Sequence, residues 1–419
     1  ALYSLDKGKP HKARFPNHNE DRRCLRVNVI ECPETDRAIR LLTEGLSFNS
    51  MFYPTCRTWT ADGQNILFET TAFGPDPNGI LGERQIQEVH SESGATQWLA
   101  TVPFTLRPRS EASDLKTSSL YHCDYAPLAD RIYFQDVNGH RLFSLNRATG
   151  DVKEIWQELD GTIGDPPSCT ADGSRIAFYV IFPGPHKNRY FSGITSAILL
   201  LDVNLETGER IGEPRLVTAF VGRTATPRNI YVNHCQINSA HPDQIIFAHE
   251  FGGCPYDGSL LRERIWFVNS DGTNEHPLIR GAHGRYHTHE VIGASGEWVY
   301  YVDTGGLCRV HIGTQKVEEI VPPGHPERLW HISVSPDEKW VVADTEIFRE
   351  KTPEGLWMSS LMLVSVETGQ MQCVCRFPCR LKHPAHPHPN FSPDGSKIAF
   401  VVGTPTGSSV ACCDVSDLL

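Results

Sequence analysis

A short turn followed by an apolar strand recurs seven times along this chain of 419 residues, and no other feature constrains the fold as strongly. The turn is small and polar, often Ser/Thr-x-Asp-Gly, and the residues after it are those of a buried β-strand. The seven turns contain Asp62, Asp130, Asp172, Asp243, Gly296, Asp337 and Asp394. Asp-Gly and Pro-Asp pairs favour hairpins because they tolerate a positive φ or preset the turn. Such self-similarity indicates a repeat architecture.

A second hairpin follows the first in each repeat. Its turns include Thr149-Gly150, Thr207-Gly208, Asp271-Gly272 and Thr368-Gly369. Two hairpins give four strands, which is one blade of a β-propeller. We therefore expect an all-β, seven-bladed β-propeller with four-stranded antiparallel blades, in which the innermost strand of each blade precedes the repeated turn. A string of unrelated β-sandwiches would not repeat one template in this way.

The two ends of the chain complete this arrangement. The last repeat ends after residues 410–415, one strand short of a blade, and the N-terminal segment from Asp36 to Thr43 can supply the missing outer strand. Closure of this kind hides two sheet edges. We expect residues 1–25 to form an N-terminal extension and residues 26–419 to form a single, monomeric propeller domain.

The charge of the chain restricts its partners. Lys and Arg number 39 against 50 Asp and Glu, so the net charge is −11. An acidic chain is a poor non-specific ligand of nucleic acid, and an acidic substrate would have to meet a local cluster of cations. No apolar run reaches the roughly 18 residues that cross a bilayer. We expect neither nucleic acid nor membrane as a partner.

Cysteine is unusually frequent, with 13 scattered residues. No pair of CxxC knuckles is present, so a zinc ribbon is not expected. A secreted protein with a few disulfides and a protein with buried free thiols both fit this pattern.

Histidines recur at a similar depth before the repeated turns. They are His122, His234, His289, His331 and His388, which lie six to nine residues ahead of the turn in their repeats. Alternate residues of a strand share a face, so this register predicts a ring of imidazoles at one end of the propeller axis. One such histidine is usually structural, but five in a common register favour a functional site.

Three of these positions suggest a metal site. His386 and His388 lie two residues apart and share a face, and His331 comes from the neighbouring blade. His383 could add a fourth ligand. Imidazoles suit manganese, zinc, iron or copper better than calcium. We expect a divalent cation, with manganese first and zinc or calcium as alternatives.

Several segments, in this order, resemble the oligogalacturonate lyases, a family of β-propeller polysaccharide lyases. They are residues 246–250 (IFAHE), 264–266 (RIW), 288–290 (THE) and 386–395 (HPHPNFSPDG), and the resemblance runs from about residue 230 to the C-terminus. It implies that His331, His386 and His388 hold a divalent cation, usually manganese. It also implies that His289 and Arg264 lie at the reaction centre.

The chain departs from that family at two positions. His383 stands where the family has a glutamine ligand, and Phe48 stands where it has a histidine. Phe48 therefore marks either an altered catalytic position or a residue that packs in the first blade. The long insertions and many cysteines fit better the related secreted lyases that cleave rhamnosyl-α-1,4-glucuronate in gum arabic. We expect a secreted lyase for these arabinogalactan ends, with oligogalacturonate as the alternative substrate.

A uronate lyase removes the proton at C5, beside the carboxylate, and expels the oxygen at C4. The reaction needs a cation for the developing charge, a base with a suitable pKa and an acid. We expect the metal and Arg264 to supply the cations and His289 to be the base. Candidates for the acid or for sugar contacts are Phe48, Tyr53, Tyr121, His122 and His234. A metal-dependent hydrolase and a non-catalytic binding propeller are the rival functions.

Overall fold

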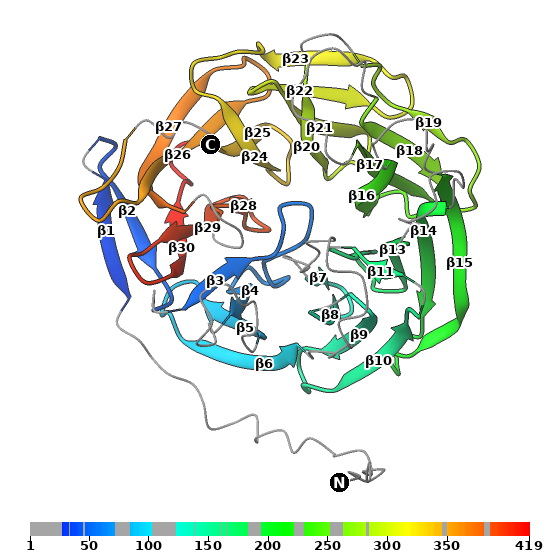
Figure 1. Cartoon of the computed structure of the whole chain (residues 1–419). Coiled ribbons are helices and arrows are strands. Elements are labelled where there is room, and N and C mark those ends of the chain that lie inside the picture. Colours follow the sequence, from blue (N-terminus) through cyan, green and yellow to red (C-terminus); the bar gives the residue numbers. More distant parts are fainter. Residues whose placement is uncertain are drawn as a thin grey trace, which may run out of the picture.

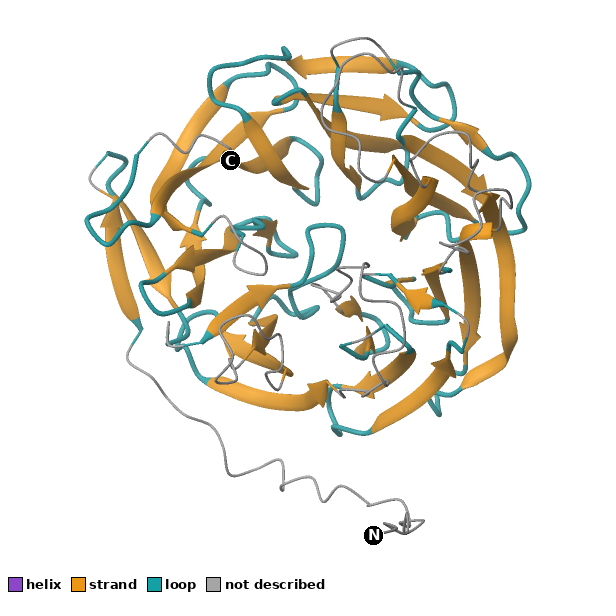
Figure 2. Cartoon of the chain, viewed as in Figure 1, coloured by secondary structure: helices purple, strands orange, loops and turns teal. Residues whose placement is uncertain are grey.

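A computed structural model describes residues 27–419 except for positions 33, 45–46, 72–83, 103–122, 138, 160, 165, 183–193, 222–229, 252–262, 282–284, 346–349 and 381–385. Seven antiparallel sheets form a ring around a common axis, which confirms the predicted propeller (Figure 1). Figure 2 shows that the described residues form strands and loops. Among these residues no helix is long and apolar enough to cross a bilayer.

In blades one to three, the chain runs from the innermost strand outward. Blade one contains β3 (Phe48–Met51), β4 (Asn65–Thr71), β5 (Arg84–His90) and β6 (Thr96–Val102). Blade two contains β7 (Cys123–Ala126), β8 (Arg131–Gln135), β9 (Arg141–Asn146) and β10 (Val152–Gln157). Blade three contains β11 (Thr162–Ile163), β12 (Ser168–Cys169), β13 (Arg175–Ile181), β14 (Ile194–Val203) and β15 (Arg210–Val221), and its innermost position is shared by the two short strands β11 and β12.

Blades four to six follow the same order. Blade four contains β16 (Ile230–Ile237), β17 (Gln244–Phe251), β18 (Ile265–Asn269) and β19 (His276–Pro277). Blade five contains β20 (His287–Ile292), β21 (Trp298–Asp303), β22 (Gly306–His311) and β23 (Val317–Val321). Blade six contains β24 (Leu329–Val334), β25 (Trp340–Thr345), β26 (Trp357–Ser365) and β27 (Met371–Cys379).

Blade seven is built from both ends of the described chain. Its strand order is β28 (Asn390–Phe391), β29 (Lys397–Gly403), β30 (Ser408–Asp414), β2 (Arg37–Leu41) and β1 (Asn28–Cys32). The predicted closure is confirmed, since β2 pairs with β30 through Leu41 opposite Ala411. The structure adds a fifth strand, because β1 pairs with β2 along its whole length and covers an edge that would otherwise stay open.

The core lies between neighbouring blades. Each middle strand is covered by another sheet on both faces, so it reads as a continuous apolar run rather than an alternating one. All five residues of β8 are buried, for example. Phe134 packs with Leu67 of blade one, and Tyr133, on the other face of β8, packs with Phe178 of blade three.

The repeated turn has a simple physical basis. The Thr60 hydroxyl donates to the Asp62 carboxylate at 2.6 Å, and Ser392 does the same to Asp394 at 2.6 Å. The glycine that follows adopts a positive φ, 66° at Gly63 and 78° at Gly395, which side chains disfavour. The Ser/Thr-x-Asp-Gly pattern is therefore the chemistry of one hairpin used repeatedly.

The cysteines in the described part of the chain are free thiols, and all of them except half-buried Cys373 are buried. For these residues the buried-thiol alternative fits better than a disulfide framework.

Candidate metal and acid–base site

Three histidines converge near the centre of the ring. His331 belongs to β24, and His386 and His388 lie just before β28 of the next blade. One ligand nitrogen from each lies within 4.8 Å of the others. The rings of His331 and His388 are 4.2 Å apart, centroid to centroid, and both side chains are buried. The chain thus gathers the three residues that the sequence proposed as metal ligands.

A buried carboxylate fixes one of these ligands. Asp344 of β25 accepts a hydrogen bond from the backbone N–H of His331 at 2.7 Å, and its Oδ2 lies 2.8 Å from His331 Nδ1. With Nδ1 engaged, Nε2 is the ligand atom that His331 can offer. Burial raises the pKa of Asp344 to about 7, and the His331 amide opposes that rise. A cation bound beside His331 would favour the ionised form of Asp344 over the protonated form.

This arrangement fits a transition-metal cation. Histidine ligands usually present one ring nitrogen to the metal and the other to a carboxylate, and His331 has such a carboxylate. An all-imidazole set suits zinc, copper, iron or nickel, whereas calcium prefers oxygen ligands.

His289 of β20 stands beside this cluster. Its ring lies 4.5 Å from that of His331 and 5.1 Å from the indole of Trp330. Burial lowers the pKa of His289 well below its usual value, and the neighbouring His331 and Arg264 lower it further. The imidazole is therefore neutral at neutral pH and can accept a proton.

A buried ion pair lies next to His289. Arg264 directly precedes β18 and is 5% exposed, and its guanidinium pairs with the carboxylate of Glu290, which is 1% exposed. Gln236 of β16 donates to the backbone carbonyl of Glu290 at 2.8 Å and joins the same network. Arg264 thus brings a positive charge close to the predicted base.

Tyr53 reaches the same place from the first blade. Its ring stacks on His234 at 4.6 Å with an interplanar angle of 11°, and meets the edge of His388 at 5.3 Å. Its hydroxyl lies 3.4 Å from Nδ1 of His289. Tyr53 therefore links three of the predicted site histidines.

Irregular backbone presents several of these side chains. His234, His289 and His388 have positive φ values of 48°, 54° and 44°. The strand register also shifts between Asn233 and Gln236, between Thr288 and Val291, and between Leu329 and Ile332. Such bulges turn side chains out of the ladder, and backbone strain of this kind costs about 1–3 kcal/mol per residue.

Four further residues were predicted for the site. Phe48 opens β3, is half-buried, and lies with its ring 5.2 Å from the guanidinium carbon of Arg380. Tyr121, His122 and His383 lie outside the described residues.

Sequence reasoning missed Asp344, Trp330 and Glu290. Asp344 had a signal, because a carboxylate near the end of an apolar second strand is unusual. The same Asp-Thr pair ends that strand in the preceding blade, where Asp303 lies 3.4 Å from Nε2 of His287. Trp330 and Glu290 flank predicted histidines inside the bulges and carry no comparable pattern.

Comparisons with known proteins agree with the propeller fold. No family model matches the chain. The oligogalacturonide lyase of Pectobacterium atrosepticum is 24% identical over 377 residues, which cover 83% of this chain and 85% of that protein. A solved oligogalacturonate lyase in complex with manganese superposes with a TM-score of 0.70 and 18% identity, over 94% of this chain and 97% of that one. An oligogalacturonate lyase from Vibrio parahaemolyticus gives 0.69 and 18%, over 94% and 99%. Over most of its length this chain is therefore similar to oligogalacturonate lyases, and it shares their β-propeller fold.

Proposed function

We propose that this protein is a metal-dependent lyase that cleaves a 4-linked hexuronate by β-elimination. The observation that carries the proposal is the meeting of the His331, His386 and His388 cluster with His289 and Tyr53. The related proteins, which are named for oligogalacturonate cleavage, support the substrate class. The cluster offers metal ligands, a neutral imidazole and a hydroxyl, which are the three things that the reaction needs.

We assign the acid–base steps to His289 and Tyr53. His289 takes the C5 proton, the C5–H electrons form the C4=C5 double bond, and the C4–O bond breaks with its electrons on the leaving oxygen. Tyr53 gives its hydroxyl proton to that oxygen. The two groups are 3.4 Å apart, so the proton on His289 can return to Tyr53 and restore both for the next turnover. The substrate carboxylate raises the pKa of the buried imidazole and makes His289 a stronger base.

A divalent cation held by His331, His386 and His388 would neutralise the substrate carboxylate and stabilise the charge that develops beside C5. Manganese is the first candidate, because a solved structure that resembles this chain contains it. Zinc and calcium are the alternatives. Arg264 adds a fixed positive charge on the His289 side, and Glu290 holds its guanidinium in place.

For the substrate we place rhamnosyl-α-1,4-glucuronate ends of gum arabic-type arabinogalactan ahead of oligogalacturonate. Three sequence features support this order: the insertions expected from Gly74 to Glu83 and from Phe182 to Thr195, the 13 cysteines, and His383 in place of the family's glutamine.

The test is an assay of the manganese-loaded protein on gum arabic and on oligogalacturonate, with and without a chelator. We expect rhamnose release together with the ultraviolet absorbance of an unsaturated uronate, and loss of both with chelator. Turnover of oligogalacturonate alone would reverse the substrate order. Cleavage without the unsaturated product would indicate a hydrolase, and sugar binding without cleavage a binding module.

The ligand set is tested separately by metal analysis. His386→Ala should remove the bound metal, whereas replacement of the exposed His241, which lies in the turn after β16, should leave it. Unchanged metal content in His386→Ala would refute the site.

A further inference from the structure

A long excursion interrupts the innermost strand of blade one. Met51 lies opposite Phe68, and the ladder resumes where the Leu67 N–H donates to the Thr58 carbonyl at 2.7 Å. Because Phe68 and Leu67 are consecutive, residues 52–57 project from the strand with no opposite residues. Figure 1 shows this blue loop near the centre of the ring. We call residues 52–57 the central loop.

One end of the central loop carries Tyr53. Its side chain is 6% exposed and touches His234, His289 and His388, which come from blades four, five and seven. The Cys56 N–H donates to the Tyr53 carbonyl at 2.7 Å, so residues 53–56 form a tight turn. The other end of that turn therefore sets where Tyr53 stands.

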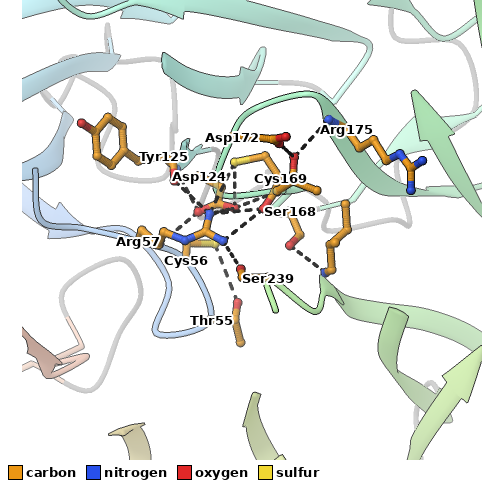
Figure 3. A network of polar contacts seen from close by, with 12 residues as sticks. Thr55, Cys56, Arg57, Asp124, Tyr125, Ser168, Cys169, Asp172, Arg175 and Ser239 are labelled. Carbon is orange, nitrogen blue, oxygen red and sulfur yellow. Dashed lines mark hydrogen bonds and ion pairs between the residues drawn. The ribbon is translucent and has the colours of Figure 1, made fainter. Parts of the chain in front are cut away.

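Arg57 directly follows this turn, and Figure 3 shows it among residues of three further blades. Its guanidinium donates to the carbonyl of Tyr125 at 3.0 Å, to the carbonyl of Cys169 at 3.2 Å, and to the hydroxyl of Ser239. These acceptors lie in blade two, in blade three and in the turn after β16 of blade four. One side chain thus joins the central loop to three blades at once.

Asp124 of β7 contacts both Arg57 and Cys169, one of the residues to which Arg57 donates. Its carboxylate is 2% exposed and lies 3.6 Å from the Arg57 guanidinium. It accepts hydrogen bonds from the backbone N–H of Arg57 at 3.0 Å and of Cys169 at 2.8 Å. These donors fix the geometry of the buried carboxylate, and losing it would leave the buried Cys169 N–H unsatisfied.

We propose that Arg57 and Asp124 are positioning residues that hold Tyr53 against His289. Both residues act on Tyr53 through the short turn that joins Tyr53 to Arg57. The proposal deepens the proposed lyase function, on which the role of Tyr53 as acid rests. A displacement of a reacting group by about 1 Å can cost about 100-fold in rate, so the anchor matters to catalysis from a distance.

The first test reads the position of Tyr53 without any substrate. The protein is labelled with 3-fluorotyrosine, and among its 12 tyrosines the Tyr53 fluorine signal is the one lost in Tyr53→Phe. Arg57→Ala and the milder Arg57→Lys should shift that signal, since a lysine cannot bridge the same acceptors. Arg175→Ala, which removes a surface ion pair with Asp243, is the matched control. An unmoved Tyr53 signal in folded Arg57 variants would overturn the proposal.

The second test uses activity and metal affinity together. In Arg57→Ala and Asp124→Asn we expect kcat to fall at least about tenfold, with manganese affinity within about threefold of the unaltered protein. Added to Tyr53→Phe, Arg57→Ala should cause little further loss, because both changes remove the same group. Independent, multiplying losses would contradict the proposal. If no variant or parent cleaves uronate, the lyase function fails while the fluorine signal still decides the positioning role.

Discussion

Oδ2 of Asp344 lies 2.8 Å from Nδ1 of His331, and both side chains are buried. The carboxylate fixes the orientation of the imidazole and leaves Nε2 toward the histidine cluster. Asp344→Asn keeps an acceptor of similar size but removes the charge. We expect manganese affinity to fall about 10- to 100-fold, measured by calorimetry, with the same melting behaviour. Affinity equal to that of the parent would show that Asp344 only supports packing.

Tyr53→Phe removes one hydroxyl and keeps the stack on His234. If Tyr53 is the acid, kcat should fall about 10²- to 10⁴-fold while KM and metal content change little. The comparison with Tyr133→Phe is informative, because that buried hydroxyl donates to the Gly173 carbonyl, away from the site. Equal losses in both variants would argue that the hydroxyl of Tyr53 serves stability alone.

Variants of the Arg264–Glu290 ion pair can distinguish an effect on stability from an effect on catalysis. Glu290→Gln leaves the guanidinium buried without its counter-charge, which should cost about 3–5 kcal/mol in the free energy of unfolding. The double change Arg264→Leu with Glu290→Leu should recover much of that loss, because no isolated charge remains. Lyase activity should stay low in both, as measured by initial rates. Full activity in the double variant would exclude a catalytic part for Arg264.

Phe48 offers a gain-of-function test. An imidazole can exchange a proton, which a phenyl ring cannot, and at the start of β3 it would lie near the Arg380 guanidinium, which favours its neutral form. If histidine belongs at this position, Phe48→His should raise turnover by roughly 100-fold. Unchanged turnover would identify Phe48 as a packing residue of blade one.

Ring closure can be tested by pH. Glu92, in the turn after β5, binds Arg40 of β2 and, at 2.6 Å, Lys397 of β29, so it ties blade one to blade seven. The hydrogen bonds from Arg40 and Lys397 lower the pKa of Glu92 to about 2. Because the folded-state pKa is depressed, the stabilisation is complete above the ordinary carboxyl value and disappears as the pH falls toward 2.

The Glu92 side chain is 50% exposed to solvent, which screens its ion pairs with Arg40 and Lys397. Glu92→Gln should therefore cost no more than about 1 kcal/mol in the free energy of unfolding at pH 7. The difference from the parent should vanish near pH 2 in denaturant titrations. Replacement of the exposed Glu206, in the corresponding turn of blade three, serves as the control. A cost that persists unchanged at pH 2 would mean that the charge of Glu92 is not responsible.

The ring and the histidine register could be predicted because they repeat. Each blade needs the same hairpin, so the turn at Asp62 returns at Asp394, and a strand's period of two places His386 and His388 on one face. Which residues of two different strands face each other cannot be predicted from a local sequence pattern in this way. The contact of Asp344 with His331 depends on which residues stand opposite across a bulge, and that becomes visible only when both strands are in place.

The central loop shows the same limit. Met51, Phe52 and Tyr53 form an apolar stretch that is typical of a continuing inner strand, yet the ladder stops at Met51. Tertiary contacts of Tyr53 and Arg57 with other blades outweigh the local preference. The extra strand β1 was missed for a related reason, because Asn28–Cys32 gains its partner only once β2 has joined the last blade.

The composition of blade seven also sets an order of events during synthesis. Strands β1 and β2 are made before the other strands, but Leu41 can meet Ala411 only after the six intervening blades have been made. Until then β2 has an unpaired edge, and the first six blades form an open arc with two ends. Contacts of such large sequence separation form slowly, and open edges invite association with other chains. The protein is therefore most vulnerable to aggregation in the interval just before its final strands appear.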